Sequence, residues 1–273
     1  MSCDAYDDLW RPFFSLLERH WSDCPFPVFL GAETKSFPKD NIHMLHPAAR
    51  GRNWSGELQE YLDMLPTQHV LLMLDDFFLR RTVPTARILR ALKFAQRSGA
   101  CAVRLVPLPG PTDPVLGESE YGVCAAGLPY RASAQAAIWN RTLLRDLLRP
   151  GESIWEFEHR GNARANLGSA QYYCTWDVVL PYPGRWAHHV VEKGKWFPHQ
   201  KWIFARQEIG CDFSRRSTLP WAQTLVYHLA RGLDRALDIL PWRTKKKFKV
   251  RLRALAQTLF PRAVGRLGGR PPS

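Results

Sequence analysis

The chain has 273 residues, of which 45% are hydrophobic and 12% aromatic, a composition typical of a folded globular protein rather than a disordered one. The net charge of +13 is concentrated at one end: residues 241–273 contain ten basic residues and no acidic ones, so residues 1–240 carry only +3. The opening segment is acidic, unlike a secretory signal, and no apolar run reaches the roughly 18 residues of a spanning helix. We therefore expect a cytoplasmic protein that does not cross a membrane.

The six cysteines are scattered along the chain and include no C-x-x-C pair; they are Cys3, Cys24, Cys101, Cys124, Cys174 and Cys211. This spacing supports neither a zinc site nor a small disulfide framework. We expect buried or free thiols in a reducing compartment.

Strand and helix patterns alternate along the first part of the chain. In order, the sequence predicts a strand over 27–33, a helix over 55–65 with Ser55 as N-cap, a strand over 69–76, a helix from about Pro84 to Gly99, and a strand over 100–110. Strong helices are then expected over 132–151 and 220–240. This order predicts an α/β fold with a mostly parallel sheet and helices on both faces.

The apolar run at residues 70–79, VLLMLDDFFL, is interrupted by two adjacent acids, Asp75 and Asp76. Ligands of parallel α/β sheets bind beyond the carboxyl ends of the strands, and the acid pair is expected at such an end. Two carboxylates there could hold Mg²⁺ or Mn²⁺, with the phosphates of a substrate completing the coordination shell. The alternative is structural, with one Asp capping a turn and the other solvated.

A second group of acids lies in the segment SIWEFEH at residues 153–159. If this segment is extended, Glu156 and Glu158 share one face, and Trp155 and Phe157 share the other. A carboxylate beside aromatic rings can have a raised pKa and act as a general base. An ordinary amphipathic strand with solvated glutamates is the alternative.

Basic residues gather in two later segments, at 190–198 and 214–217. Lys193, Lys195, Arg215 and Arg216 could bind phosphates, and Gly194 would allow a close approach of the backbone. A solvated basic loop would give the same pattern.

The last basic segment, 241–273, has the spacing of an amphipathic helix, with Phe248, Leu252, Leu255 and Leu259 on one face. Such a helix is typical of a membrane-surface element that binds anionic lipid. Nucleic-acid binding and a disordered tail are the alternatives.

The motifs LLMLDDFFL, YRASAQAAIWNRTLLRDLL, SIWEFE and VVEKGKW occur in an order that resembles bacterial surface-polysaccharide glycosyltransferases of the GT-A fold. The similarity spans about residues 27–216 and depends on the order and spacing of the motifs. It implies a GT-A-like, Rossmann-type domain over residues 1–240, followed by the basic amphipathic tail at 241–273, which is expected to associate with the membrane.

The resemblance also implies roles for individual residues. Asp75 and Asp76 would bind Mn²⁺ or Mg²⁺ and the donor diphosphate, although the usual motif of the family is Asp-x-Asp. Glu156 or Glu158 would be the base on the acceptor in an inverting enzyme, and neither need be one in a retaining enzyme. The donor nucleotide would contact Glu33, Thr34 and Trp54. Apart from the resemblance, the basic side chains of Lys193, Lys195 or Arg216 are expected to stabilise the departing nucleotide.

The function expected from these observations is transfer of a sugar from a nucleotide-sugar donor to a glycan or lipid-linked acceptor, at the inner face of the membrane. A sugar-nucleotide nucleotidyltransferase would share the sheet, the metal and the nucleotide. A nucleic-acid-binding protein that acts through its basic tail is the third hypothesis. The near-neutral composition of residues 1–240 argues against it, so no nucleic-acid partner is expected.

Overall fold

The computed structural model describes residues 1–48, 53–184 and 189–236, so the predicted tail at 241–273 lies outside the described residues. The chain divides into two compact units. The first contains Met1–Val190 and Ile203–Arg215, and the second contains Val191–Trp202 and Arg216–Ser273. Each unit is described by itself below.

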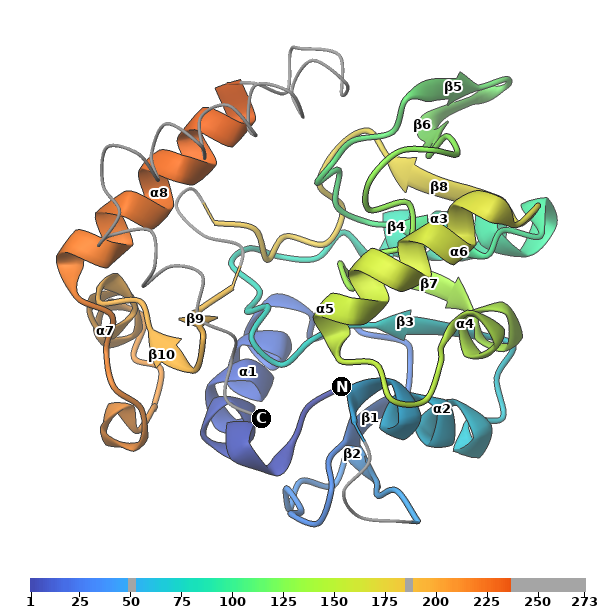
Figure 1. Cartoon of the computed structure of the whole chain (residues 1–273). Coiled ribbons are helices and arrows are strands. Elements are labelled where there is room, and N and C mark those ends of the chain that lie inside the picture. Colours follow the sequence, from blue (N-terminus) through green and yellow to red (C-terminus); the bar gives the residue numbers. More distant parts are fainter. Residues whose placement is uncertain (49–52, 185–188, 237–273) are drawn as a thin grey trace. The chain divides into compact units, whose positions relative to one another are not determined.

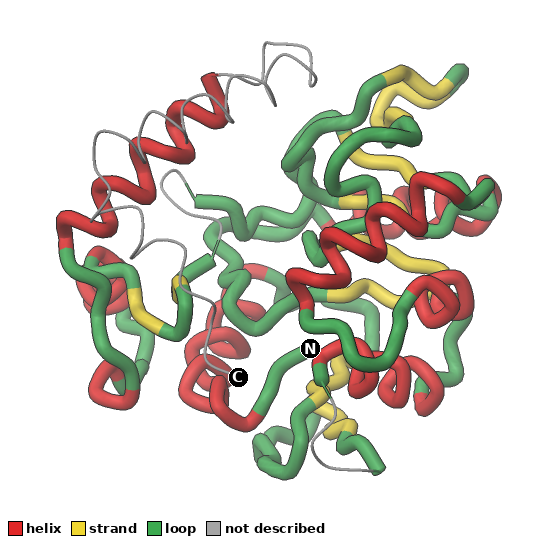
Figure 2. The backbone as a smooth tube through the Cα atoms, in the orientation of Figure 1, coloured by secondary structure: helices red, strands yellow, loops and turns green. Residues whose placement is uncertain are grey.

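The first unit is built on a six-stranded sheet with the strand order β3-β7-β4-β8-β6-β5 (Figure 1). The strands are short, and long loops connect many of them (Figure 2). In sheet order, they are β3 (His69–Leu72), β7 (Ala137–Asn140), β4 (Ala102–Arg104), β8 (Tyr172–Thr175), β6 (Glu118–Val123) and β5 (Asp113–Val115).

The α/β class is confirmed, but the prediction of a mostly parallel sheet is wrong. Only β4 and β8 pair in parallel, and the other four pairings of this sheet are antiparallel. β3 and β4 do run in the same direction, as expected of strands joined through a helix. They are not neighbours, however, because β7 lies between them and is antiparallel to both.

The predicted helix over 132–151 is wrong in its first half. Residues Ala137–Asn140 form β7, and the helix α4 begins only at Arg141 and ends at Leu147. Asn140 starts this helix as its N-cap, with its side chain accepting a hydrogen bond of 3.1 Å from the amide of Leu143. Burial between two strands outweighed the helix propensity of the alanines at 134, 136 and 137.

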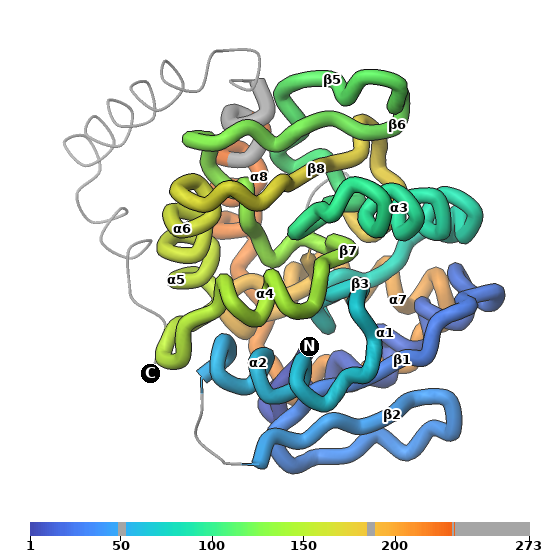
Figure 3. The backbone as a smooth tube through the Cα atoms, turned by 90° about the vertical axis from the view of Figure 1, so that its right-hand side faces the viewer, coloured from blue at the N-terminus to red at the C-terminus, as the bar shows by residue number. Residues whose placement is uncertain are grey.

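Helices cover both faces of the sheet (Figure 3). One face packs against α3 (Thr85–Ser98), which was predicted at this position and ends at Gly99 in the left-handed conformation, with φ of 62°. The other face packs against α2 (Trp54–Met64) and α4, with α5 (Ile154–Glu156), a π-helical turn at Phe157–Gly161, and α6 (Asn162–Leu167) beside them. In β7, Ile138 belongs to the core on the α3 face of the sheet, and Trp139 belongs to the core on the face covered by α2 and α4. Both faces of the strand are therefore buried, which explains why it is apolar at successive positions.

A smaller sheet lies at the beginning of the chain. The predicted first strand is confirmed as β1 (Val28–Gly31), which pairs in parallel with β2 (Ile42–Leu45). The helix α1 (Asp7–His20) packs on it through Trp10 and Phe14. The predicted helix over 55–65 is confirmed as α2, but its N-cap is Asn53 and Ser55 lies inside it.

The second unit contains a two-stranded hairpin and a long helix. The hairpin pairs β9 (Val191–Glu192) with β10 (Lys195–Trp196), and α8 (Trp221–Ala236) confirms the helix predicted at 220–240 as far as it is described. Helix α7 (His199–Arg206) crosses from this unit into the first. No helix among the described residues is long and apolar enough to cross a membrane.

Candidate active site

The carboxyl ends of β3, β4 and β8 lie at the same edge of the six-stranded sheet as the amino end of β7. The register places Leu72, Ala137, Arg104 and Cys174 in one row across these four strands. Residues that follow Leu72, Arg104 and Cys174 therefore lie near residues that precede Ala137. This edge brings together segments that are far apart in the sequence, and it contains the candidate site.

Asp75 lies in the turn that follows β3 and is held by the N-terminal segment of the chain. The Ser2 hydroxyl donates a hydrogen bond to the Asp75 carboxylate, and Trp10 Nε1 donates one of 2.6 Å to the Ser2 oxygen. Burial, together with the neighbouring charge of Asp76, raises the pKa of Asp75 to about 7. The first acid of the pair is thus fixed in position, and burial with repulsion from the second acid favours its protonated form.

Asp76 lies in the same turn and is anchored through its backbone. Its carbonyl accepts a hydrogen bond of 3.1 Å from the amide of Val190. The next residue, Phe77, is buried and stacks on Tyr182, with ring centroids 4.5 Å apart and planes 3° from parallel. The phenylalanines after the acid pair, Phe77 and Phe78, therefore pack in the core and hold the turn in place.

Tyr182 connects the acid pair to the segment that enters β7. Its hydroxyl donates a hydrogen bond to Gln135 Oε1 and accepts one of 3.3 Å from the amide of Ala136. Burial raises the pKa of Tyr182, the Asp76 charge raises it further, and Arg104 opposes both. The phenol is therefore neutral at physiological pH and lies within electrostatic range of both charges.

Arg104 is a buried cation at the end of β4, with 4% of its surface exposed. Its guanidinium donates hydrogen bonds to the carbonyls of Tyr130 (2.9 Å) and Pro109 (2.7 Å) and contacts Cys124 Sγ at 3.5 Å. These partners hold the guanidinium in place, and its charge acts on Glu158 and Tyr182.

Glu158 lies in the π-helical turn and reaches the same edge of the sheet. One of its carboxylate oxygens accepts a hydrogen bond of 3.0 Å from the amide of Ala134. Burial raises the pKa of Glu158, while this hydrogen bond and the Arg104 charge oppose the rise. Residues 134–136 therefore hold both Glu158 and Tyr182, and through Tyr182 they connect to Asp76.

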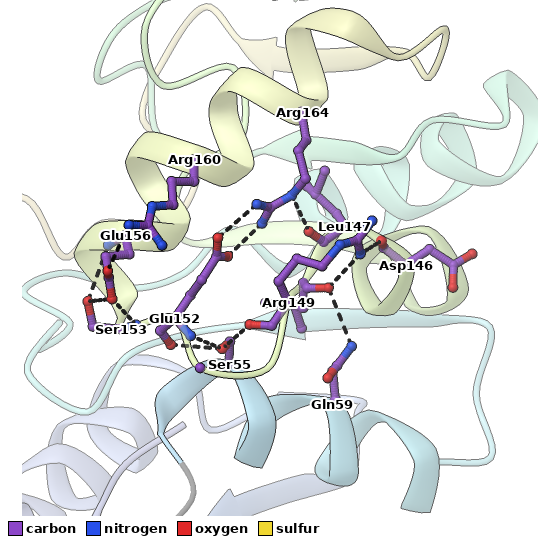
Figure 4. A network of polar contacts seen from close by, with 12 residues as sticks. Ser55, Gln59, Asp146, Leu147, Arg149, Glu152, Ser153, Glu156, Arg160 and Arg164 are labelled. Carbon is purple, nitrogen blue, oxygen red and sulfur yellow. Dashed lines mark hydrogen bonds and ion pairs between the residues drawn. The ribbon is translucent and has the colours of Figure 1, made fainter.

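Glu156 has a different environment, shown in Figure 4. The predicted strand over 153–159 is wrong because Ser153 caps a helix here and Glu156 completes the capping box, each side chain bonding the backbone amide of the other. The amide and hydroxyl of Ser153 lower the pKa of Glu156, and its side chain is 43% exposed. The two glutamates therefore do not share a face, and only Glu158 points to the sheet edge.

The end of β1 is held by Asp4. Its carboxylate accepts hydrogen bonds from the amides of Thr34 and Lys35, both at 3.0 Å, and from the Thr34 hydroxyl, while its own amide donates to Glu33. Burial disfavours ionisation of Asp4, but these hydrogen bonds outweigh it and lower its pKa to about 2. The predicted nucleotide contacts Glu33 and Thr34 thus belong to an ordered acidic loop.

Glu57 and Tyr61, on α2, face this loop. Glu57 is 5% exposed, and burial followed by the charge of Glu33 raises its pKa to about 7. Between the loop and the acid pair lies Cys3, whose thiol pKa is raised to about 12 by burial and then by the charges of Asp75 and Glu33. The charges of the acidic loop and of the Asp75 turn therefore both act on the Cys3 thiol.

Trp54, another predicted nucleotide contact, begins α2. Its ring packs against Phe157, with centroids 5.4 Å apart, and joins the core on that face of the sheet. The structure thus gives Trp54 a packing role.

The predicted basic residues belong to two different units. Lys193 and Gly194 form the two-residue loop of the β9–β10 hairpin, with φ of 51° and 74°, and Lys193 and Lys195 are exposed. The positive φ at Gly194 thus serves a tight turn. Arg216 also lies in the second unit, whereas Arg215 lies in the first and pairs with Asp7 at 2.6 Å.

Asp75 and Asp76 are the residues that could hold a metal ion. Among the residues that the structure describes, no three His, Cys, Asp or Glu side chains form a group that could bind one. Two carboxylates suffice for Mg²⁺ or Mn²⁺ when substrate phosphates supply further ligands. Burial and the charge of Asp76 both raise the pKa of Asp75, and a bound cation would offset both effects, so the acid pair fits a divalent metal ion.

Sequence reasoning missed three site residues: Ser2, Arg104 and Tyr182. Arg104 had a visible signal, since it is the one charged residue in the apolar stretch 100–110. Ser2 and Tyr182 had none, because they meet the acid pair only through tertiary contacts. Gln135 lies in the segment before β7 and accepts the hydrogen bond of the Tyr182 hydroxyl.

No protein-family model matches this chain, and no curated protein matches it in sequence.

Proposed function

We propose that this protein is a metal-dependent glycosyltransferase that moves a sugar from a nucleotide-sugar donor to a hydroxyl of a glycan or lipid-linked acceptor. The proposal rests on the first unit alone. The observation that carries it is the connection of the Asp75–Asp76 turn to Glu158 through Tyr182, Gln135 and the backbone of residues 134–136.

The acid pair supplies the donor end of the site. Asp75 and Asp76 would hold Mn²⁺ or Mg²⁺, and the ion would stabilise the negative charge of the departing nucleoside diphosphate. Asp75 is fixed by Ser2, so Asp76 is the better candidate for direct contact with the metal and the diphosphate. The acidic loop at Glu33 and Thr34 is the candidate contact for the hydroxyl and amino groups of the nucleoside, which are hydrogen-bond donors.

Glu158 supplies the acceptor end of the site. In an inverting reaction the acceptor oxygen attacks the anomeric carbon, the carbon–oxygen bond to the diphosphate breaks, and the Glu158 carboxylate takes the acceptor proton. The raised pKa of Glu158 favours this proton transfer near neutral pH. In a retaining reaction Glu158 would instead position the sugar.

Calorimetry can test donor binding directly. Nucleotide sugars with uridine, guanosine, adenosine and cytidine bases are titrated into the whole chain with and without Mn²⁺. We expect one base class to bind with Mn²⁺ and at least tenfold more weakly without it. Asp76→Asn should remove the dependence on Mn²⁺, and Asp23→Asn, the same change at an exposed acid, should keep it. Absence of binding for every donor in both conditions contradicts the proposal.

Product analysis separates the proposal from the closest alternative enzyme. A glycosyltransferase releases a nucleoside diphosphate, or a monophosphate from a cytidine donor, when an acceptor is present. A nucleotidyltransferase incubated with a sugar phosphate and a nucleoside triphosphate releases pyrophosphate. Pyrophosphate release that depends on Asp76 would favour the second enzyme.

A further inference from the structure

Helix α8, drawn in orange in Figure 1, has one face that packs within the second unit. Thr224 on this face is 1% exposed, and the rings of Tyr227 and His228 lie 5.0 Å and 5.8 Å from the ring of Phe197. These contacts fix the rotation of the helix about its own axis.

The neighbouring face of α8 is apolar and exposed. Trp221, Leu225 and Leu229 follow one another at intervals of four residues and are 67%, 59% and 64% exposed. Val226, 47% exposed, widens the stripe. Residues one turn apart lie on the same side of a helix, so these four side chains form a continuous apolar stripe.

This stripe differs from the solvent face of an ordinary helix. The exposed face of a surface helix usually carries charged and polar residues, but the ten residues from Trp221 to Ala230 contain no Asp, Glu, Lys or Arg. Helix α7 adds another exposed tryptophan to this unit, Trp202, which is 62% exposed. A stripe of this kind marks a surface that is covered in use.

The charge of the second unit identifies the kind of surface that covers it. By sequence, this unit contains 16 basic and 3 acidic residues, whereas the first unit contains 22 of each. The entire net charge of +13 therefore belongs to the unit that carries the apolar stripe. Its partner should be both anionic and able to take up leucine and tryptophan side chains.

We infer that the stripe of Trp221, Leu225, Val226 and Leu229 docks onto an anionic lipid bilayer, with α8 lying in the plane of the interface. Helices that bind in this way bury an apolar face at the headgroup boundary and gain further affinity from basic residues near anionic lipid. Tryptophan is favoured at that depth because its ring is apolar and its N–H stays hydrated. Single-stranded nucleic acid would match the charge but not Leu225, Val226 and Leu229, since aliphatic side chains neither stack on bases nor donate to phosphates.

Vesicle flotation with the full chain tests this inference independently of any transferase activity. The vesicles contain either phosphatidylcholine alone or phosphatidylcholine with about 30% phosphatidylglycerol, an anionic lipid whose surface potential attracts basic residues. Leu225→Ser/Leu229→Ser is compared with Leu116→Ser/Leu167→Ser, which makes the same change at two exposed leucines of the neutral unit. All four side chains are exposed, so both variants should keep the thermal midpoint of the wild type.

We expect the wild type to float with the anionic vesicles and the α8 variant to bind them at least tenfold more weakly, with the control variant within twofold of the wild type. Equal binding by all three proteins overturns the inference, because the lipid would then be bound by charge alone. Sedimentation without lipid tests for a dimer. If the wild type is a dimer, the α8 variant is a monomer and both float equally, the stripe binds a second copy of the chain and the inference is overturned. Leucine-dependent binding to single-stranded RNA in the absence of lipid affinity also contradicts it.

Discussion

The amide of Ala134 donates a hydrogen bond of 3.0 Å to the carboxylate of Glu158, and the amide two residues later holds the Tyr182 hydroxyl. Glu158, a carboxyl with a raised pKa, is thus within electrostatic range of the buried cation Arg104, and Tyr182, bound by the same segment, is within electrostatic range of Asp76. The hydrogen bond to the amide of Ala134 also separates Glu158 from Glu156, whose carboxylate belongs to a helix cap.

The first prediction compares these two glutamates. If Glu158 removes the acceptor proton, Glu158→Gln should lower kcat by about 10²–10⁴-fold and leave donor affinity within a few fold, because the amide cannot accept a proton. Glu156→Gln should keep kcat within about threefold and reduce stability only slightly. Release of nucleoside diphosphate, measured with the donor that calorimetry identifies, provides the rate. A larger loss of kcat in Glu156→Gln than in Glu158→Gln would reverse the assignment.

The second prediction concerns pH. The pKa of Asp75 in the folded protein, about 7, lies above its ordinary value of 3.8, so the folded state binds a proton that the unfolded state releases. The resulting stability is fully present below about pH 4 and is lost as the pH rises through about 7. Unfolding in urea at several pH values should therefore show a decline between pH 4 and 7 that is smaller in Asp75→Asn.

Metal binding should change with pH in the opposite direction. Because Asp75 must be ionised to attract a cation, the rise in the thermal midpoint caused by Mn²⁺ with a nucleoside diphosphate should increase from pH 6 to pH 8. A midpoint shift that is constant over this range, or that persists in the Asp75→Asn/Asp76→Asn variant, would show that the acid pair is not the metal site.

The sequence predicted that the acid pair lies at the end of a strand because local patterns carry this information. An apolar strand, a helix with a glycine at its end and a further strand are short-range features, and β3, α3 and β4 lie within the predicted ranges. Both strands are shorter than predicted, since β3 ends at Leu72 and β4 contains only Ala102–Arg104, so the acids follow β3 in a turn. The sequence did not reveal that β7 separates β3 from β4. The pairing of β7 is a long-range contact, and the alanines before Ile138 have a strong helix propensity that concealed the strand.

The segment that contains the candidate base Glu158 also shows that local sequence alone does not determine secondary structure. Alternating side chains at residues 155–158 are compatible with a strand, and Ser153 followed three residues later by Glu156 is equally the signature of a capping box. Glu152, directly before the cap, is buried and bound to Arg164 on α6, and this contact cannot be read from local sequence.

The third prediction concerns this ion pair, drawn in Figure 4. Glu152 is 4% exposed and receives both guanidinium nitrogens of Arg164, at 2.8 and 2.6 Å. Glu152→Ala leaves the arginine without its partner and should lower the free energy of unfolding by about 3 kcal/mol. Asp63→Ala breaks an exposed two-point pair with Arg145 and should cost less than about 1 kcal/mol.

Urea unfolding followed by fluorescence measures both variants under the same conditions. The buried pair should also be less sensitive to salt than the exposed pair, because water screens the latter. If the two variants lose the same stability, burial does not govern the strength of the Glu152–Arg164 pair.

The fourth prediction concerns the hairpin in the second unit. Lys193 and Gly194 both have positive φ, the backbone that a two-residue loop between antiparallel strands requires. Gly194→Ala adds a β-carbon in this conformation and should destabilise the hairpin by roughly 1–2 kcal/mol. Lys193→Asn removes the charge but tolerates the same backbone, so the hairpin should persist.

Hydrogen exchange over residues 191–197 measures the free energy of local opening of this hairpin. Exchange should accelerate about 5- to 30-fold in Gly194→Ala and stay near the wild-type rate in Lys193→Asn. Equal acceleration in both variants would mean that the lysine side chain, rather than the turn, holds the two strands together.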